Sequence, residues 1–246
     1  MGIGRLKKYI FKLTPNKILN FYQGPIKSQI KEESFSSLSY SQEGEDLIVN
    51  RFLENKEKGF YVDVGAHHPK RFSNTFNFYK RGWSGLNIDA MPRSMDLFKI
   101  ERPRDINLEI GVSKEKGELI YYMFNEPALN TFSRTEAEKK DGLRDYKIIE
   151  KRKILTYPLK EIFEKHLQEK QQIDFMTIDV EGLDLEVIES NDWKKYRPNL
   201  LLVEELVKYT LAELPLKSDL YKLLISNEYS LVAKTFNTLF FKDNRI

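Results

Sequence analysis

From residue 39 onward the chain alternates short apolar runs with amphipathic segments, and this alternation constrains the fold more than any other feature. Apolar runs that end at Gly or charged residues are typical of buried strands, and apolar residues three and four apart are typical of helices. Strands that alternate with helices form a mostly parallel sheet covered on both faces. We therefore expect an α/β fold with a doubly wound sheet. Its strands should cover residues 59–65, 85–90, 104–113, 173–179 and 198–205. Its helices should cover residues 39–55, 73–80, 93–99, 159–169 and 218–227, with one more beginning near Asp184.

Three segments depart from this alternation. Residues 117–124 (GELIYYMF) are another strand-like run. The polar stretch over residues 125–153 has no clear core face, so we expect a long irregular loop of the kind that is often functional. Residues 229–243 read as two strands that turn at Phe236–Asn237, which predicts a C-terminal antiparallel hairpin.

A basic extension, residues 1–38, precedes the expected domain of residues 39–246. Its first 35 positions hold seven Lys or Arg residues and two acidic ones. Leu6, Ile10 and Leu13 fall at helical spacing, which favours a short amphipathic helix. Such a helix fits either peripheral contact with anionic lipid or packing against the outside of the domain, and the second arrangement is the commoner one.

Composition excludes several classes of protein. Lys and Arg total 40 against 37 acidic residues, and this balance argues against a protein that neutralises many nucleic-acid phosphates. The chain has no cysteine, which excludes disulfides, thiolate catalysis and Cys-ligated zinc. No run approaches the roughly 18–20 apolar residues of a membrane span, and the N-terminus lacks the apolar region of a signal peptide. We expect a cytoplasmic protein, and the sequence is compatible with a homo-oligomer.

Polar residues follow the first two strands of the expected sheet. Asp63 is followed by Gly65, which lets the backbone turn tightly and approach a ligand. Asp89 ends the next strand, at an offset where an acid commonly binds the ribose hydroxyls of an adenosine ligand. The G-x-G-x-x-G pattern of dinucleotide enzymes is absent, as is a Tyr-x-x-x-Lys pair, so an NAD-dependent dehydrogenase or epimerase is disfavoured.

Further carboxylates follow the strands at residues 173–179 and 198–205. If these strands are neighbours, Asp179 and either Glu204 or Glu205 converge on one crevice. Two carboxylates there suit a hard divalent cation or acid–base work. The alternative is that they cap helices and face solvent, as most acidic residues do.

A histidine pair, His67–His68, directly follows the glycine turn. An imidazole in the ligand crevice is a natural general base, because its unperturbed pKa is about 6.5. The alternative is that one of the two only packs beside a ligand. The sequence favours a function for one of the pair and does not identify which.

The motifs YVDVGAHHP, GLNIDAMP, INLEIGVS and FMTIDVEGLDLEVIE, in this order and preceded by SQEGEDLIV, resemble the FkbM family of S-adenosylmethionine (SAM)-dependent methyltransferases. The match covers roughly residues 39–242. The segments AHHP, FNEPALNTF and RPRDINLEI are similar to a subgroup from bacterial surface-polysaccharide pathways. The resemblance implies a class I methyltransferase (Rossmann-like) fold with parallel strands in the order 3-2-1-4-5 and an antiparallel hairpin at one edge.

The resemblance also implies where SAM binds. The methionine end would contact the glycine turn and Gln42, the ribose would contact Asp89, and the adenine would lie against the segment after the third strand. The family's usual glycine-containing first loop is replaced here by His67–His68, which suggests a special role for the pair. The implied cofactor residues are Gln42, Asp63, Gly65, Ala66, His67, Asp89, Ala90, Ile110, Gly111, Val112 and Asp179.

Family members generally methylate hydroxyls, so the resemblance implies an O-methyltransferase that acts on a sugar, either a nucleotide-sugar or a capsule or lipopolysaccharide precursor. A hydroxyl needs a base or a metal to lose its proton. The expected catalytic residues are His67, His68, Asp179 and Glu181, and the expected ligands of a divalent Mg, Mn or Fe ion are Asp179, Glu204 and Glu205. The expected acceptor-binding residues are Asn125, Asn130 and Thr131, with Tyr121, Tyr122, Phe124 and Phe132 as walls, although these also fit an ordinary strand and turn.

Two alternatives share this fold. A non-catalytic module would keep the SAM or nucleotide pocket and would not transfer a methyl group. A methyltransferase for a non-sugar small molecule would differ only in its acceptor pocket. Methyl transfer to a purified acceptor distinguishes these from a sugar O-methyltransferase.

Overall fold

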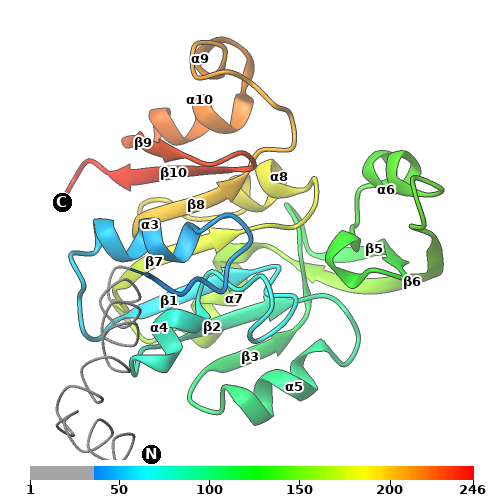
Figure 1. Cartoon of the computed structure of the whole chain (residues 1–246), viewed down its shortest axis with the longest axis horizontal. Helices are drawn as coiled ribbons and strands as arrows, with labels where there is room; N and C mark the ends of the chain where they lie inside the picture. Colours follow the sequence, from blue (N-terminus) through cyan, green and yellow to red (C-terminus); the bar gives the residue numbers. More distant parts are fainter. Residues whose placement is uncertain (1–35) are drawn as a thin grey trace, which may run out of the picture. The chain divides into compact units, whose positions relative to one another are not determined.

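The computed structural model describes residues 36–246 (Figure 1). The amphipathic helix expected around Leu6, Ile10 and Leu13 lies outside these residues. The described part is built on a seven-stranded sheet with the order β3-β2-β1-β7-β8-β10-β9. Within residues 36–246, no helix combines the length and the apolar character that crossing a membrane requires.

Five strands of the central sheet are parallel, and the last two form an antiparallel hairpin at one edge. Numbered along the chain, the parallel strands have the order 3-2-1-4-5, so the doubly wound fold and its C-terminal hairpin are confirmed. The strands are β1 (Phe60–Val64), β2 (Ser84–Asp89), β3 (Ile106–Glu109), β7 (Ile173–Ile178), β8 (Pro198–Glu204), β9 (Tyr229–Lys234) and β10 (Thr238–Asp243).

Helices cover both faces of this sheet because successive strand residues point to opposite sides. Val62 and Val64 of β1 pack in one apolar cluster, with side chains of α7, α8 and α10. Tyr61, which directly precedes Val62, points to the other side and packs in a second cluster with side chains of α3 and α4. All six residues of β7 are buried, as expected of a central strand. The helices are α3 (Glu45–Phe52), α4 (Phe76–Lys80), α5 (Ser94–Glu101), α7 (Leu159–His166), α8 (Asp184–Glu189), α9 (Leu214–Lys217) and α10 (Asp219–Ser226).

A second, three-stranded sheet with the order β4-β6-β5 lies beside the central one (Figure 1). It corrects two expectations. The expected third strand is divided between β3 and β4 (Gly111–Val112), which belong to different sheets. The stretch 125–153, expected to be irregular, instead contains a 3₁₀ helix, η1 (Pro127–Leu129), a helix, α6 (Arg134–Lys140), and the first part of a ten-residue strand. This strand, β6 (Ile148–Tyr157), pairs antiparallel with β5 (Gly117–Phe124) along its length.

A fully buried arginine at the end of α5 holds the loop that follows β1. Arg102 Nε donates to Pro69 O (2.9 Å), and its terminal nitrogens donate to Thr75 Oγ1 (2.7 Å) and Ser73 Oγ (2.6 Å). All five N–H donors of the guanidinium have acceptors. Thr75 Oγ1 in turn donates to Asp63 Oδ2 (2.7 Å). The loop therefore takes its shape from a side chain of a different element.

We expect Arg102→Met to lower the free energy of unfolding by about 3 kcal/mol or more, because Met leaves a buried carbonyl and two hydroxyls without their partner. Urea unfolding of both proteins measures the difference. The control is Arg152→Met, which removes a half-exposed ion pair with Glu150 and should change stability by less than about 0.5 kcal/mol. Equal, small losses in the two variants would contradict the role given to Arg102.

Candidate cofactor and catalytic site

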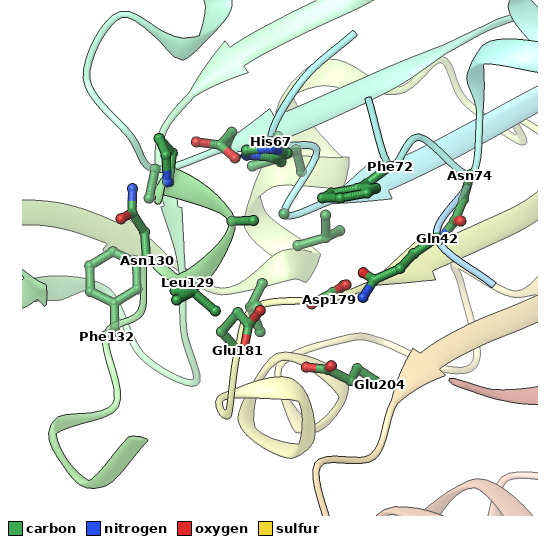
Figure 2. A pocket seen from close by; sticks show the side chains of 18 of the residues that line it. Gln42, His67, Phe72, Asn74, Leu129, Asn130, Phe132, Asp179, Glu181 and Glu204 are labelled. Carbon is green, nitrogen blue, oxygen red and sulfur yellow. The ribbon is translucent and has the colours of Figure 1, made fainter. Parts of the chain in front are cut away.

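A cavity of about 300 Å³ lies at the carboxyl ends of β1, β2, β7 and β8 (Figure 2). Ligands of doubly wound sheets bind at this edge, and the volume lies within the range of small-molecule sites. Strand β5 and the segment that joins β5 to β6 supply one wall. Residues expected from the sequence that line the cavity are Gln42, Gly65, His67, Asp89, Ala90, Ile110, Val112, Tyr121, Asn130, Phe132, Asp179, Glu181 and Glu204.

Gly65 directly follows β1, in a conformation that brings two loops into contact. Its φ is +85°, and a Cβ at this position would lie 1.7 Å from the carbonyl oxygen of Asp179. Asp179 N donates to Val64 O (3.0 Å), and the N–H groups of Gly65 and Ala66 donate to Ile88 O (2.9 and 3.0 Å). Only glycine fits here, because the carbonyl of Asp179 occupies the space that a Cβ would need.

Asp89, at the end of β2, is a buried carboxylate held by backbone donors. Its Oδ2 accepts from His67 N (2.8 Å) and its Oδ1 accepts from Met91 N (2.7 Å). Burial raises its pKa, and the two backbone hydrogen bonds counteract that rise. A carboxylate offers about four lone-pair sites, so two remain for hydroxyls of a ligand.

His67 and His68 point to different surroundings. His67 lines the cavity, adopts φ +51°, and has a buried Nε2 with no hydrogen-bond partner in the described part of the chain. Burial lowers its pKa to about 4, with a further contribution from Arg71, so the ring is neutral at pH 7. His68 does not line the cavity, and its Nδ1 accepts from Lys70 N (3.0 Å) and Arg71 N (2.9 Å).

Three carboxylates converge at the other end of the cavity (Figure 2). Oxygen atoms of Asp179, Glu181 and Glu204 all lie within 4.8 Å of one another. Burial, followed by repulsion from neighbouring carboxylates, raises the pKa of both Asp179 and Glu204. Glu204 Oε2 is buried and has no hydrogen-bond partner among residues 36–246, whereas Glu181 forms an ion pair with Lys140.

Asp184 and Thr131 position this carboxylate loop without entering the cavity. The two carboxylate oxygens of Asp184 accept from Val180 N and Gly182 N (both 3.1 Å). Thr131 Oγ1 donates to Glu181 O (2.8 Å), which links the second sheet to the loop. Both side chains therefore hold the backbone on which Asp179 and Glu181 are carried.

Other residues singled out in the sequence also lie outside the cavity lining. Asp63 is buried under the β1 loop, and Ala66 packs against α5. Gly111 lies so close to Phe132 that a Cβ there would be 2.8 Å from the ring. The side chain of Asn125 bonds to Asp145 O and Lys147 N, and Glu205 Oε2 accepts from Ser218 Oγ (2.7 Å).

The sequence reasoning missed several lining residues, because the loops that carry them have no pattern of their own. Arg71 and Glu126 form a two-pronged ion pair (2.9 and 3.0 Å) between the β1 loop and the start of η1. The Asn74 amide donates to Thr177 Oγ1 (2.9 Å). The other lining residues that were not singled out are Glu45, Val64, Phe72, Ile88, Pro127, Ala128, Leu129, Tyr146, Val180, Asn237 and Thr238.

The residues present fit SAM, the cofactor that the sequence resemblance implies. Asp89 retains acceptor sites for a ribose diol, and the neighbouring Ile110 and Val112 offer an apolar surface for a base. Gly65 lines the cavity between these groups and the carboxylates, where the β1 and β7 loops touch. The carboxylates of Asp179, Glu181 and Glu204, at the other end of the cavity, suit a cationic group such as a sulfonium.

Residues 63–229, more than half of the chain, match the family described as Methyltransferase FkbM domain. No curated protein has a matching sequence. A solved methyltransferase FkbM from Methylobacillus flagellatus is 12% identical with a TM-score of 0.43, over 75% of this chain and 44% of that chain. This chain thus spans less than half of that protein's length.

Two further solved structures are similar to the chain. A TehB-like SAM-dependent methyltransferase from Corynebacterium glutamicum is 8% identical with a TM-score of 0.40, over 91% of this chain and 98% of that one. The 1,6-didemethyltoxoflavin-N1-methyltransferase of Burkholderia thailandensis, with bound 1,6-didemethyltoxoflavin and S-adenosylhomocysteine (SAH), is 12% identical with a TM-score of 0.41, over 94% and 91% of the two chains.

Gly65→Ala tests the contact between the two loops, and Gly142→Ala is its matched control. Both glycines have nearly the same φ (+85° and +84°), but a Cβ at Gly142 meets nothing within 4 Å. We expect about 1–2 kcal/mol of destabilisation in Gly142→Ala from the left-handed backbone alone. Gly65→Ala should lose a further 1–3 kcal/mol or so, and SAH binding with it, because the loops must separate. Urea unfolding and calorimetric titration of SAH measure both, and equal effects would contradict the contact.

His67 should make folding pH-dependent. Below about pH 6.5 the unfolded chain protonates this histidine, whereas the folded chain does so only near pH 4, so stability falls as the pH falls between these values. The loss is at most about 1.4 kcal/mol per pH unit. His67→Asn, which tolerates a positive φ, should reduce this slope in urea unfolding at pH 7, 6 and 5. His166→Asn on α7 should reduce it less, and an unchanged slope in His67→Asn would exclude a buried neutral imidazole.

Proposed function

Because the chain belongs to the methyltransferase FkbM family, and is thereby a SAM-dependent methyltransferase, we propose that it methylates a hydroxyl of a sugar with the help of a divalent metal ion. The proposed acceptor is a nucleotide-sugar or a capsule or lipopolysaccharide precursor of a bacterial surface-polysaccharide pathway, and the proposed location is the cytoplasm. The observation that carries the proposal is the convergence of Asp179, Glu181 and Glu204 in the cavity that also holds Gly65 and Asp89. Lipid contact by the basic extension, and a homo-oligomer, stay predictions.

The cofactor end of the cavity, around Asp89 and Gly65, binds SAM and orients its methyl group toward the acceptor. SAM supplies a methyl group on a positively charged sulfur, already activated for attack, so the protein needs mainly to align the reactants. Asp89 accepts hydrogen bonds from the ribose, and the methionine end lies along the lining residue Gly65, beside the contact between the β1 and β7 loops. Gln42 and Asn74 line the same side of the cavity and offer amide groups to that end.

The carboxylate end receives the proton of the acceptor hydroxyl. An alcohol is a poor nucleophile at neutral pH, so its proton must be drawn away as the methyl group is transferred. Asp179, Glu181 and Glu204 repel one another when ionised, so burial and this repulsion raise the pKa of Asp179 and Glu204 and the cluster holds part of its protons. The member that is ionised is a stronger base than an ordinary carboxylate and can accept the proton of the hydroxyl. We assign the proton to this cluster and not to His67, which lies beside Asp89 with a pKa of about 4, or to His68, which is outside the cavity.

The same cluster fits a hard divalent cation. Carboxylate oxygens are the ligands that Mg²⁺ and Mn²⁺ prefer, and Asp179, Glu181 and Glu204 would supply them. Glu204 Oε2, buried without a partner, is the atom that most needs a cation. A bound ion would lower the pKa of the acceptor hydroxyl and would offset the mutual repulsion of Asp179, Glu181 and Glu204. Glu205, whose side chain bonds to Ser218, would not take part.

We expect Glu204→Gln to lower methyl transfer about 100-fold or more and to leave SAH affinity within about threefold, because it removes one charge at the acceptor end only. Glu205→Gln is the matched control, one residue further along and directed at Ser218, and should keep both properties. Transfer from labelled SAM to a panel of nucleotide-sugars and polysaccharide precursors, with SAH titrations, measures both.

Removal of metal tests the second half of the proposal. After EDTA treatment we expect methyl transfer to fall and to recover with Mg²⁺ or Mn²⁺ in the wild type, with no recovery in Glu204→Gln. Full activity in EDTA would contradict metal assistance. Transfer only to non-sugar acceptors would show that the acceptor is not a sugar. SAH binding without transfer to any acceptor would favour a non-catalytic module. No SAH binding under any condition would contradict the function as a whole.

A further inference from the structure

A four-residue strap, residues 126–129, forms part of the cavity wall just after β5. All four residues line the cavity, and none of the three that form η1 is buried. An asparagine fixes each end of the strap. The side chain of Asn125 bonds to the backbone of residues 145 and 147, and Asn130 Oδ1 accepts from Phe124 N (2.7 Å). The strap is therefore held firmly at its ends and more loosely between them.

One ion pair joins the strap to the β1 loop. The two terminal nitrogens of Arg71 donate to the two carboxylate oxygens of Glu126, at 2.9 and 3.0 Å. Both residues line the cavity, yet their side chains are 45% and 31% exposed, so the pair lies at the mouth of the cavity and not on its floor. Figure 2 shows Leu129 of the strap on one side and Phe72 of the β1 loop on the other. Within residues 36–246, no other hydrogen bond or ion pair joins the strap to the β1 loop.

Contacts within the β1 loop place this ion pair at the cofactor end of the cavity. The guanidinium of Arg71 lies over the ring of Phe72, 4.4 Å from its centroid. The ring of Phe72 is stacked with that of His67, with centroids 6.4 Å apart and an interplanar angle of 21°. His67 N donates to Asp89, the proposed partner of the ribose. These contacts connect the floor of the cofactor end to the ion pair at the mouth.

We propose that the Arg71–Glu126 ion pair is a latch, which holds the strap over the bound cofactor and limits the rates at which SAM enters and SAH leaves. The proposal rests on the proposed SAM site and adds a function for the second sheet in cofactor exchange. A two-pronged ion pair fixes the geometry of the closed strap. Because the pair is partly exposed, breaking it costs little, so the strap can open often enough for turnover.

The kinetics of SAH binding to the full-length protein test the latch without an acceptor, and surface plasmon resonance measures them. We expect Arg71→Gln and Glu126→Gln each to raise both the association and the dissociation rate constant about three- to fivefold, the size of one partly exposed ion pair. The Kd should stay within about twofold, because the latch closes both the free and the bound protein. Glu126→Gln keeps an oxygen for Ala128 N and leaves Arg71 over Phe72. A residue that only contacted SAH would instead weaken binding and raise dissociation alone.

Two further proteins make the result specific. Arg134→Gln removes an ion pair with Glu138 on α6, outside the cavity lining, and should change neither rate constant. The double variant of Arg71 and Glu126 should exchange SAH no faster than either single variant, because each substitution breaks the same latch. Unchanged rate constants in both single variants, or a rise in Kd equal to the rise in dissociation, would overturn the latch while leaving the SAM site intact. Failure of wild-type protein to bind SAH would instead contradict the proposed function.

Discussion

The contact between Gly65 and the carbonyl of Asp179 is the constraint on which the rest of the site depends. Parallel pairing of β1 with β7 brings both strands to the same edge, where Val64 O accepts from Asp179 N. The chain can then turn into the cofactor loop only at a residue without a Cβ. One backbone contact therefore joins the loop proposed to meet the methionine end of SAM to the loop that carries the carboxylates. The distance between the proposed cofactor site and the carboxylates is in this way set by the sheet and not by flexible side chains.

Much of the fold could be predicted because its strands are buried on both faces and read as apolar runs. β7 (IDFMTI) is wholly buried, and its run in the sequence is correspondingly clear. β6 could not be predicted in the same way. It carries charged residues from Glu150 to Lys153 on both faces, so it shows neither an apolar run nor an alternation, and it is a strand because β5 pairs with it. Pairing with a partner overrides local pattern, which is the usual reason for such errors.

The site was predictable to the level of strand ends and no further. Carboxyl ends of parallel strands meet at one edge, so Asp89, Asp179 and the Glu204–Glu205 pair could be placed near one another from the sequence. Which of two neighbours enters the cavity depends on the local backbone. Neighbouring residues at a strand end point to opposite sides, and the structure directs Glu204 inward and Glu205 to Ser218.

The β1 loop shows why the remaining residues were missed. Its shape is imposed by Arg102, some thirty positions later in the chain, through Pro69 O, Ser73 and Thr75. That shape turns His67 into the cavity and leaves His68 to accept from the backbone. The sequence motif does not indicate which of the two histidines enters the cavity, because no residue close to them in the sequence distinguishes them. The orientation of the two histidines depends on the buried guanidinium of Arg102, which lies outside the motif.

Charge explains why such a cavity suits a cationic cofactor. Six acidic side chains line it, against Arg71 and a neutral His67. Arg71 forms an ion pair with Glu126, and Lys140 forms one with Glu181. The other four lining acids have no ion-pair partner in the described part of the chain: Glu45, Asp89, Asp179 and Glu204. Burial raises the pKa of Asp89, Asp179 and Glu204, and for Asp179 and Glu204 repulsion between neighbouring acids raises it further. A sulfonium, and a divalent ion beside it, supplies the missing positive charge and favours the ionised form of these acids. Ligand binding and proton release are therefore coupled here, and the same excess of acids opposes the binding of an anionic group at that end.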